Sequence, residues 1–369
     1  MSSFSRKISQ GFQALSLAIS YWNSSSALPF AEVQNFYLRI RENMAKLGLI
    51  CCIYNDTRYL NQLFRSCENI HVDDVNIYFV DDNSTVDLEP YFEEVLARHK
   101  NFKFLRNTSE YLGAGAARNC VLDLVDDEYI GCIDADDFVA PTYHQQLIDL
   151  MDRYELECIK TGWTIVQNGS RIQSRLEDVI PQNEILPGNN YFGPYNKSNL
   201  YDRPHSWAGL FRKEFLDKNK IRYSNLFSAE DRLFWTKCLL SAERLMAIQI
   251  ENGYFYRKEN ANDRLTAVGN KIQNDYFKAA IEIIDYCLTQ DVPVDAWRKI
   301  ITQIIALTDF HYRNRERLSD IALFDMHYKC SILCEKLKLC PEFEFIYSKI
   351  SKPRKDMIRI FEKKDFRYE

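Results

Sequence analysis

The chain has 369 residues, a length that suits either one large domain with an appendage or two domains. It is 46% hydrophobic and 27% charged, a composition that excludes a disordered or collagen-like protein and supplies enough apolar residues for a sizeable core. The formal net charge of -5 gives no overall positive field, so we do not expect nucleic acid as the main partner.

The eleven cysteines are scattered along the chain and do not form a disulfide framework, which favours a reducing compartment. Cys330, Cys334 and Cys340 lie near His327 with largely helical spacing, and we expect buried thiols there in preference to a zinc site. No apolar stretch approaches the roughly 20 residues that span a bilayer, and polar residues interrupt the N-terminal segment that a signal peptide would need. We therefore expect a cytoplasmic protein, which could act at the inner face of the cell membrane.

From Leu47 onward, short apolar runs alternate with amphipathic stretches. Strands that alternate with helices indicate crossover connections, and hence an α/β fold with a mainly parallel, Rossmann-like sheet and helices on both faces. Ligands of such sheets bind beyond the carboxyl ends of the strands. The pattern predicts strands at 47–53, 75–80, 102–105, 129–133 and 157–166, and helices at 58–67, 89–99, 115–124 and 143–154.

Three stretches of the chain depart from this alternating pattern. Residues 1–44 are polar and helix-prone, the stretch 167–204 lacks clear periodicity, and the pattern is helical from Lys271 to the end. The irregular stretch is either a mobile lid or an irregular subdomain. We predict a helical preamble at 1–44, a catalytic domain at 45–265 and a helical C-terminal region at 266–369.

Acidic residues follow three of the predicted strands, in the sequences Tyr54-Asn55-Asp56, Asp81-Asp82-Asn83 and Asp134-Ala135-Asp136-Asp137. Singly, such residues are ordinary turn formers and helix caps. Three carboxylates within four residues after a buried strand repel one another unless a cation lies between them. A divalent metal with oxygen ligands, normally Mg²⁺ or Mn²⁺ with a phosphate, is the usual arrangement.

A site that holds a metal and a phosphate is consistent with two classes of reaction, which are phosphoryl transfer and displacement of a nucleotide diphosphate. The sequence has no Walker motif. Gly113-Ala114-Gly115 resembles part of a dinucleotide fingerprint, but Arg118 stands where the third glycine belongs. A phosphatase with an aspartate nucleophile also places a D-x-D pair after a strand. That pair usually follows the first strand, whereas here it follows the fourth.

Over residues 46–260 the order and spacing of the motifs resemble the family 2 glycosyltransferases of GT-A fold. The motifs are Tyr54-Asn55-Asp56, Val80-Asp81-Asp82-Asn83-Ser84, Gly115-Ala116-Ala117-Arg118-Asn119, Asp134-Ala135-Asp136-Asp137, Trp207-Ala208-Gly209-Leu210-Phe211-Arg212-Lys213, Phe227-Ser228-Ala229-Glu230-Asp231 and Tyr254-Phe255-Tyr256-Arg257. The resemblance does not cover residues 1–44 or 270–369.

The resemblance implies a role for each matching residue. Tyr54, Asp56 and Asp82 would hold the donor base, with Asp82 accepting the imide N–H of a uracil. Arg118 would lie near the nucleotide. Asp134 would approach the ribose and the metal, Asp136 would bind the metal on the diphosphate, and Asp137 would be structural or a supporting residue.

In the same family, the acid of the Glu-Asp element is the general base, which here suggests Asp231 with Glu230 as neighbour or alternate. A carboxylate can remove the proton of an acceptor hydroxyl as the new bond forms, and direct displacement inverts the anomeric centre. The alternative is a helix N-terminus, capped by Ser228, whose first turn favours acids. Both interpretations can hold together.

Basic side chains are in question at three further positions, Gly209, Arg257 and Arg264. The family often has lysine at the position of Gly209, so its contact is missing or supplied by a neighbour such as Arg212 or His205. Arg257 and Arg264 could close over the diphosphate, although surface arginines are the commoner case.

The last hundred residues include basic amphipathic stretches, among them the tail around Met357, Ile358 and Phe361. Basic amphipathic helices with aromatic residues can lie on anionic membranes, so peripheral membrane contact is one hypothesis. Packing against the catalytic domain or against a second subunit of a homo-oligomer is the other.

The sequence therefore predicts a metal-dependent, inverting glycosyltransferase of hexosyltransferase type. It would move a sugar from a nucleotide-diphosphate donor, a UDP-sugar, to a hydroxyl of a glycan or lipid-linked glycan in bacterial polysaccharide synthesis. The alternatives are a D-x-D phosphohydrolase or nucleotidyltransferase, and a non-catalytic scaffold that binds nucleotide-sugars.

Overall fold

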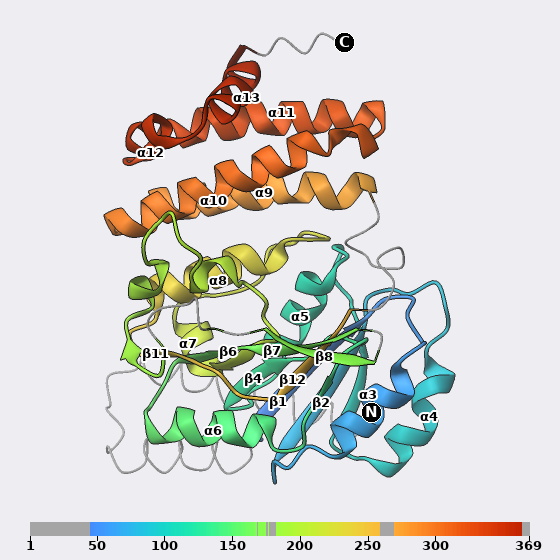
Figure 1. Ribbon diagram of the computed structural model, residues 1–369. Coiled ribbons are helices and arrows are strands. Elements are labelled where there is room, and N and C mark those ends of the chain that lie inside the picture. Colours follow the sequence, from blue (N-terminus) through green and yellow to red (C-terminus); the bar gives the residue numbers. More distant parts are fainter. Residues whose placement is uncertain (1–44, 168, 175, 177–181, 259–268, 364–369) are drawn as a thin grey trace, which may run out of the picture. The chain divides into compact units, whose positions relative to one another are not determined.

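A computed structural model describes residues 45–167, 169–174, 176, 182–258 and 269–363 (Figure 1). Ala45–Glu369 form one compact unit. The predicted preamble at 1–44 and Arg264 lie outside the described residues. The boundary predicted near residue 265 stays a prediction.

The main sheet has eight strands in the order β3-β2-β1-β4-β10-β6-β11-β9. Its centre is parallel, since β1 (Leu47–Ile53) pairs in parallel with both β2 (Val75–Asp81) and β4 (Tyr129–Cys132). The carboxyl ends of these three strands, with the acids that follow them, therefore meet at one edge. The remaining strands are β3 (Phe102–Arg106), β6 (Cys158–Thr161), β9 (Ile185–Leu186), β10 (Gly209–Arg212) and β11 (Leu245–Ile248).

A second sheet has four strands in the order β5-β12-β7-β8. They are β5 (Phe138–Val139), β12 (Tyr254–Arg257), β7 (Trp163–Gln167) and β8 (Ser170–Ser174). The prediction of one strand over 157–166 is wrong, because β6 and β7 belong to different sheets. Their pairing partners change at Gly162, and glycine inside a strand pattern often marks such a break.

Helices cover both faces of the main sheet, as predicted. In Figure 1, α6 (Tyr143–Arg153) lies on one face, whereas α5 (Ala114–Leu122) and α8 (Glu230–Ser241) lie on the other. This burial of both faces explains why nearly every residue of β1 is apolar and buried. The other helices of this region are α3 (Leu60–Glu68), α4 (Glu89–Arg98) and α7 (Lys213–Lys218).

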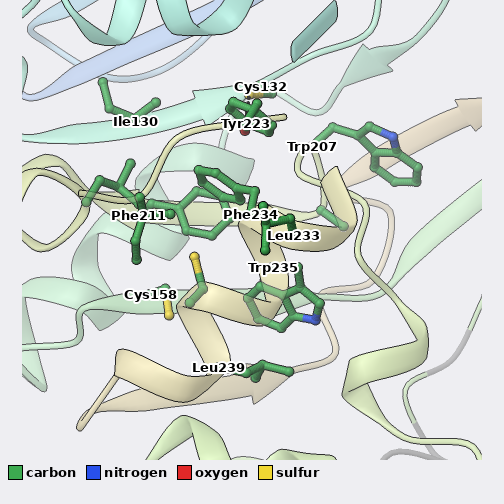
Figure 2. Close-up of a cluster of buried hydrophobic side chains, with 14 of the residues drawn as sticks. Ile130, Cys132, Cys158, Trp207, Phe211, Tyr223, Leu233, Phe234, Trp235 and Leu239 are labelled. Atoms are coloured by element: carbon green, nitrogen blue, oxygen red, sulfur yellow. Dashed lines mark hydrogen bonds between the residues drawn. The ribbon is translucent and has the colours of Figure 1, made fainter. Parts of the chain in front are cut away.

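Helix α8 is held by aromatic packing against the sheet. Figure 2 shows Phe234 close to Phe211 of β10 and to Tyr223; the ring centroids are 5.1 Å and 4.1 Å apart. Trp235 Nε1 also donates a hydrogen bond of 3.0 Å to the carbonyl oxygen of Leu200. The helix that begins with Glu230 is therefore fixed against both the sheet and the segment around residue 200.

The stretch 167–204 has little regular structure, as its sequence indicates, but its described part is not loosely attached. It contains β8, β9 and two short 3-10 helices, at Gly188–Phe192 and Leu200–Asp202. Tyr191, Phe192 and Leu200 are buried in the core. These contacts favour an irregular subdomain over a mobile lid for the described residues.

The C-terminal region is helical, as predicted, and consists of α9 (Gly269–Leu288), α10 (Val294–Arg313), α11 (Asp320–Leu337), α12 (Phe343–Lys349) and α13 (Lys352–Lys363). Cys330, Cys334 and Cys340 are buried free thiols. No helix among the described residues is long and apolar enough to cross a membrane.

The apolar face of α13 points into the protein. Met357, Ile358 and Phe361 are buried, and the Phe361 ring lies 5.3 Å from that of Tyr312 and 5.6 Å from that of His327. The apolar face of the basic tail therefore packs against α10 and α11, which belong to the same C-terminal region; packing against the catalytic domain or a second subunit was the expectation. Membrane contact and self-association stay predictions.

Candidate functional site

The acids after β4 have two different environments. The carboxylate of Asp137 is buried, accepting hydrogen bonds of 2.8 Å from the Tyr254 hydroxyl and from the backbone N–H of Arg257. Burial, together with the charges of Asp136 and Asp134, raises the pKa of Asp137 well above its usual range. Asp134 and Asp136 are half-buried, so they are the two acids of this loop that a ligand could reach.

Arg118 joins the loop after β4 to the start of α8. Arg118 is 5% exposed, and its guanidinium donates to Glu230 Oε1 over 2.8 Å and to Asp134 Oδ1 over 3.2 Å. The guanidinium carbon lies 5.2 Å from the centre of the Tyr223 ring. One buried cation thus holds two acids that come from separate elements, which a planar guanidinium does better than an ammonium.

Several acidic side chains lie near the Arg118 guanidinium. Burial and the charge of Asp231 raise the pKa of Glu230 to about 7, although Arg118 opposes the shift. Burial, with the charges of Asp136 and Asp231, likewise raises the pKa of Asp134. The carboxylate of Asp231 is half-buried and has no hydrogen bond or ion pair with the side chains or backbone of the described residues.

Glycines allow α5 to approach the start of α8 closely. Gly113 has a φ of 115°, and a Cβ there would lie 2.6 Å from the carbonyl oxygen of Leu226. A Cβ on Gly115 would lie 2.6 Å from the carbonyl oxygen of Ser224 and 2.8 Å from Glu230 Cβ. The two glycines of the G-x-G sequence therefore allow α5 and the start of α8 to pack closely, and this packing brings Arg118 to Glu230.

The N-cap of α8 is Ala229, in a left-handed conformation with a φ of 60° and no side-chain cap. The hypothesis that Ser228 caps the helix is therefore wrong, because Ser228 lies one residue too early. The first turn still carries Glu230 and Asp231, where the helix dipole favours acids.

The loop after β1 is pinned by Asn55, which the sequence analysis did not single out. Its side-chain oxygen accepts from the backbone N–H and the hydroxyl of Thr85 over 2.8 Å and 3.0 Å. Asp56 is bound by Arg58, whose hydrogen bonds lower the pKa of this carboxyl. Tyr54 contacts Phe227 edge to face, with 6.2 Å between ring centroids, which places Tyr54 beside the approach to α8.

Asp82 is 2% exposed, and both of its oxygens have partners. Oδ1 accepts from Asn107 Nδ2 over 2.7 Å and Oδ2 from the N–H of Gly113 over 2.6 Å. Burial raises the pKa of Asp82 despite these bonds. Asp82 therefore fixes the turn that begins α5, and a uracil would have to share its oxygens.

Arg257 also has protein partners. Its Nε donates to the carbonyl oxygen of Asp136 over 2.7 Å, its Nη2 donates to Gln62 over 2.6 Å, and the guanidinium lies over the Tyr59 ring. In this arrangement Arg257 supports the loop that carries Asp136. The structure thus brings Arg118, Asp134 and Glu230 into direct contact, whereas Asp56, Asp82 and Arg257 are engaged by other partners.

Lys160 is a residue that the sequence analysis missed, since it lies inside a predicted strand. It is 1% exposed and stands opposite Gly209 in the pairing of β6 with β10. Its ammonium donates to the carbonyl oxygen of His205 and lies 4.8 Å from the centre of the Trp235 ring. Burial lowers the pKa of Lys160 to about 8, and the charge of Asp231 opposes this shift.

Gly209 could not be a lysine in this backbone. It has a φ of 152°, and a Cβ there would lie 2.0 Å from the carbonyl oxygen of Ile159. The cation that the resemblance led us to expect at position 209 is thus absent, while Lys160 places one on the adjacent strand.

Known glycosyltransferases share sequence with this chain. The family model described as Glycosyl transferase family 2 matches residues 49–219. EpsH of Bacillus subtilis, named as a glycosyltransferase, is 22% identical over 71% of this chain and 74% of its own length. The poly(ribitol-phosphate) beta-N-acetylglucosaminyltransferase TarS of Staphylococcus aureus is 23% identical over 61% of this chain and 37% of its own length.

Solved structures show the same fold. Residues 1–349 of S. aureus TarS in complex with UDP-GlcNAc superpose with a TM-score of 0.66 and 19% identity. The match covers 87% of this chain and 88% of that one. It therefore includes a large part of the C-terminal helical region as well as the α/β sheet.

Proposed function

Because the chain is a member of glycosyltransferase family 2, we propose that it transfers a sugar from a UDP-sugar to a hydroxyl of a glycan or lipid-linked glycan, with inversion. The observation that supports this most is the convergence of Asp134, Arg118 and Glu230 where the strands of the parallel sheet end. The TarS complex with UDP-GlcNAc supports UDP as the nucleotide.

Asp231 is the proposed general base. Its carboxylate has no partner among the described residues, and it follows Glu230, which Arg118 holds in place. Asp231 would take the proton of the acceptor hydroxyl as that oxygen bonds to the anomeric carbon, and the nucleotide diphosphate would leave from the opposite side. A positioned base of this kind contributes about 10²–10⁴-fold in rate.

The residues after β4 fit a divalent metal, Mn²⁺ or Mg²⁺. Asp134 and Asp136 offer half-buried carboxylate oxygens, which hard cations prefer, whereas Asp137 is occupied by Tyr254 and Arg257. Within the described ranges, no three acidic, histidine or cysteine side chains are grouped to hold a metal alone. Phosphate oxygens of the donor would complete the shell, and the metal would neutralise the departing diphosphate.

A second solved neighbour supports the metal. The mannosyltransferase PcManGT of Pyrobaculum calidifontis, in complex with GDP-Man and Mn²⁺, superposes with a TM-score of 0.50 and 11% identity, covering 91% of this chain and 93% of that one. We propose the same class of donor and metal here. The setting we propose is bacterial surface polysaccharide synthesis.

A thermal-shift screen tests the proposal. The full chain is heated with UDP-, GDP-, CDP- and dTDP-sugars, each with and without Mn²⁺, and donor turnover is then measured with the sugar that binds. We expect the largest stabilisation with a UDP-sugar and Mn²⁺ together. Hydrolysis of simple phosphate esters without any response to nucleotide-sugars would support the phosphohydrolase instead. Tight UDP binding without turnover would support the scaffold.

A further inference from the structure

Helix α9 lies outside both the family-matched residues and the predicted catalytic domain, yet it contacts the segment that carries the proposed base. We call residues 224–231 the acid segment, because it ends with Glu230 and Asp231. Asp275 Oδ2 accepts hydrogen bonds from the backbone N–H groups of Phe227 and Ser228, over 2.9 Å and 3.3 Å.

A second contact comes from the same face of α9. Ser224 Oγ donates to Glu282 Oε2 over 2.5 Å, and Glu282 follows Asp275 by seven residues, which is two helical turns. Asp275 and Glu282 therefore hold the acid segment at its beginning and at the residues just before Glu230. Hydrogen bonds to an ionised carboxylate are stronger than those between neutral groups.

The segment needs such support because of its backbone. Ala229, directly after the two amides that Asp275 binds, is left-handed, a conformation that alanine keeps only where its surroundings enforce it. This residue sets the direction in which α8 leaves and therefore where Glu230 and Asp231 point. Gly113 and Gly115 lie against the other side of the acid segment. The contact is so close that a Cβ on either glycine would clash with the segment.

We propose that Asp275 is a positioning residue for the transfer reaction, assisted by Glu282. It holds the acid segment so that Glu230 meets Arg118 and Asp231 is presented to the acceptor hydroxyl. The helical C-terminal region then helps to position the acids of the active site. This inference rests on the proposed function, since it assigns Asp231 as the base.

The test compares three full-length variants with the wild type. Asp275→Ala removes the acceptor oxygen, Asp275→Asn keeps one, and Asp285→Ala is the control, since Asp285 lies on the same helix but pairs with Lys336. We expect Asp275→Ala to lower kcat about 10-fold to 100-fold with KM for the donor within about threefold. Asp275→Asn should recover most of kcat, and Asp285→Ala should match the wild type.

Unchanged kcat in Asp275→Ala, or an equal loss in Asp285→Ala, would overturn the proposal. If Asp275→Ala does not fold, Ser224→Ala removes the other contact, and a kcat equal to that of the wild type then overturns the role of α9. Hydrogen exchange gives a readout that is independent of activity. Asp275→Ala should speed exchange of peptides covering residues 224–231 and leave those covering β1 unchanged, whether or not the wild type transfers sugar.

Discussion

Arg118 donates a hydrogen bond of 2.8 Å to Glu230, although 112 residues separate them in the sequence. The same guanidinium reaches Asp134, so one buried cation offsets part of the repulsion among the acids of the site. An arginine does this because its planar group can meet two carboxylates at once.

Arg118→Lys tests this relationship. We expect kcat for sugar transfer to fall about 10-fold to 100-fold, because an ammonium cannot keep both acids in place. Arg222→Lys is the matched control, since Arg222 also pairs with two acids, Asp123 and Asp217, but at a more exposed position. Steady-state kinetics of both variants check the expectation, and equal activities in the two would contradict it.

Asp231→Asn separates chemistry from binding. The amide cannot take a proton, so we expect turnover to fall about 10²-fold to 10⁴-fold. Affinity for UDP and Mn²⁺, measured by calorimetry, should stay within about threefold, because Asp231 has no described partner whose position depends on it. Loss of nucleotide binding would instead place Asp231 in the donor site.

Much of the α/β core could be predicted from sequence because burial on both faces leaves a continuous apolar signature, as in residues 47–53. The change of sheet at Gly162 could not, since it depends on which strands pair and leaves no change in hydrophobic pattern. The burial of the apolar face of α13 likewise depends on where α10 and α11 lie.

The candidate site could likewise be predicted only in part from the sequence. The motifs predicted the candidate residues, but the partners of Asp56, Asp82 and Arg257 are local contacts that no spacing encodes. Lys160 was missed because a lysine in a strand pattern predicts an exposed side chain, and its burial requires both β10 and α8.

Asp136→Asn tests the metal. An amide is a weaker ligand than a carboxylate for a hard cation, so the stabilisation that Mn²⁺ adds to the UDP-sugar complex should largely disappear. Asp149→Asn, an exposed change on α6, should keep the full response. A thermal shift with and without Mn²⁺ measures both, and an unaltered metal response in Asp136→Asn would remove Asp136 from the metal site.

Gly115→Ala tests the close approach of α5 to the acid segment. The new methyl group would meet the Ser224 carbonyl and Glu230, so the segment must shift and kcat should fall about 10-fold or more. Gly48→Ala is the control, because its Cβ would also be crowded, by Asp127, but away from the acids. Both variants are assayed at a temperature where both are folded. If they keep the same fraction of wild-type kcat, the close approach of α5 to the acid segment is not needed for activity.

His144 predicts a pH dependence of stability. It is 1% exposed, its Nδ1 has no hydrogen-bond partner in the part of the chain that the structure describes, and burial lowers its pKa to about 3. The unfolded chain takes up a proton near the ordinary value of about 6.5, whereas the folded chain does not, so stability is lost as the pH falls below about 6.5. Between about pH 7.5 and pH 5 this single group should cost about 2 kcal/mol of unfolding free energy.

His144→Gln isolates that contribution, because the shifted acids and the other histidines are present in both proteins and cancel in the comparison. Urea unfolding at several pH values should show the wild type losing about 2 kcal/mol more than His144→Gln over that range. The exposed His71 provides the control, since His71→Gln makes the same change of residue type at the surface. Parallel curves for the wild type and His144→Gln would mean that His144 is protonated in the folded protein, and hence that the packing of α6 against β4 admits water or a partner for its ring.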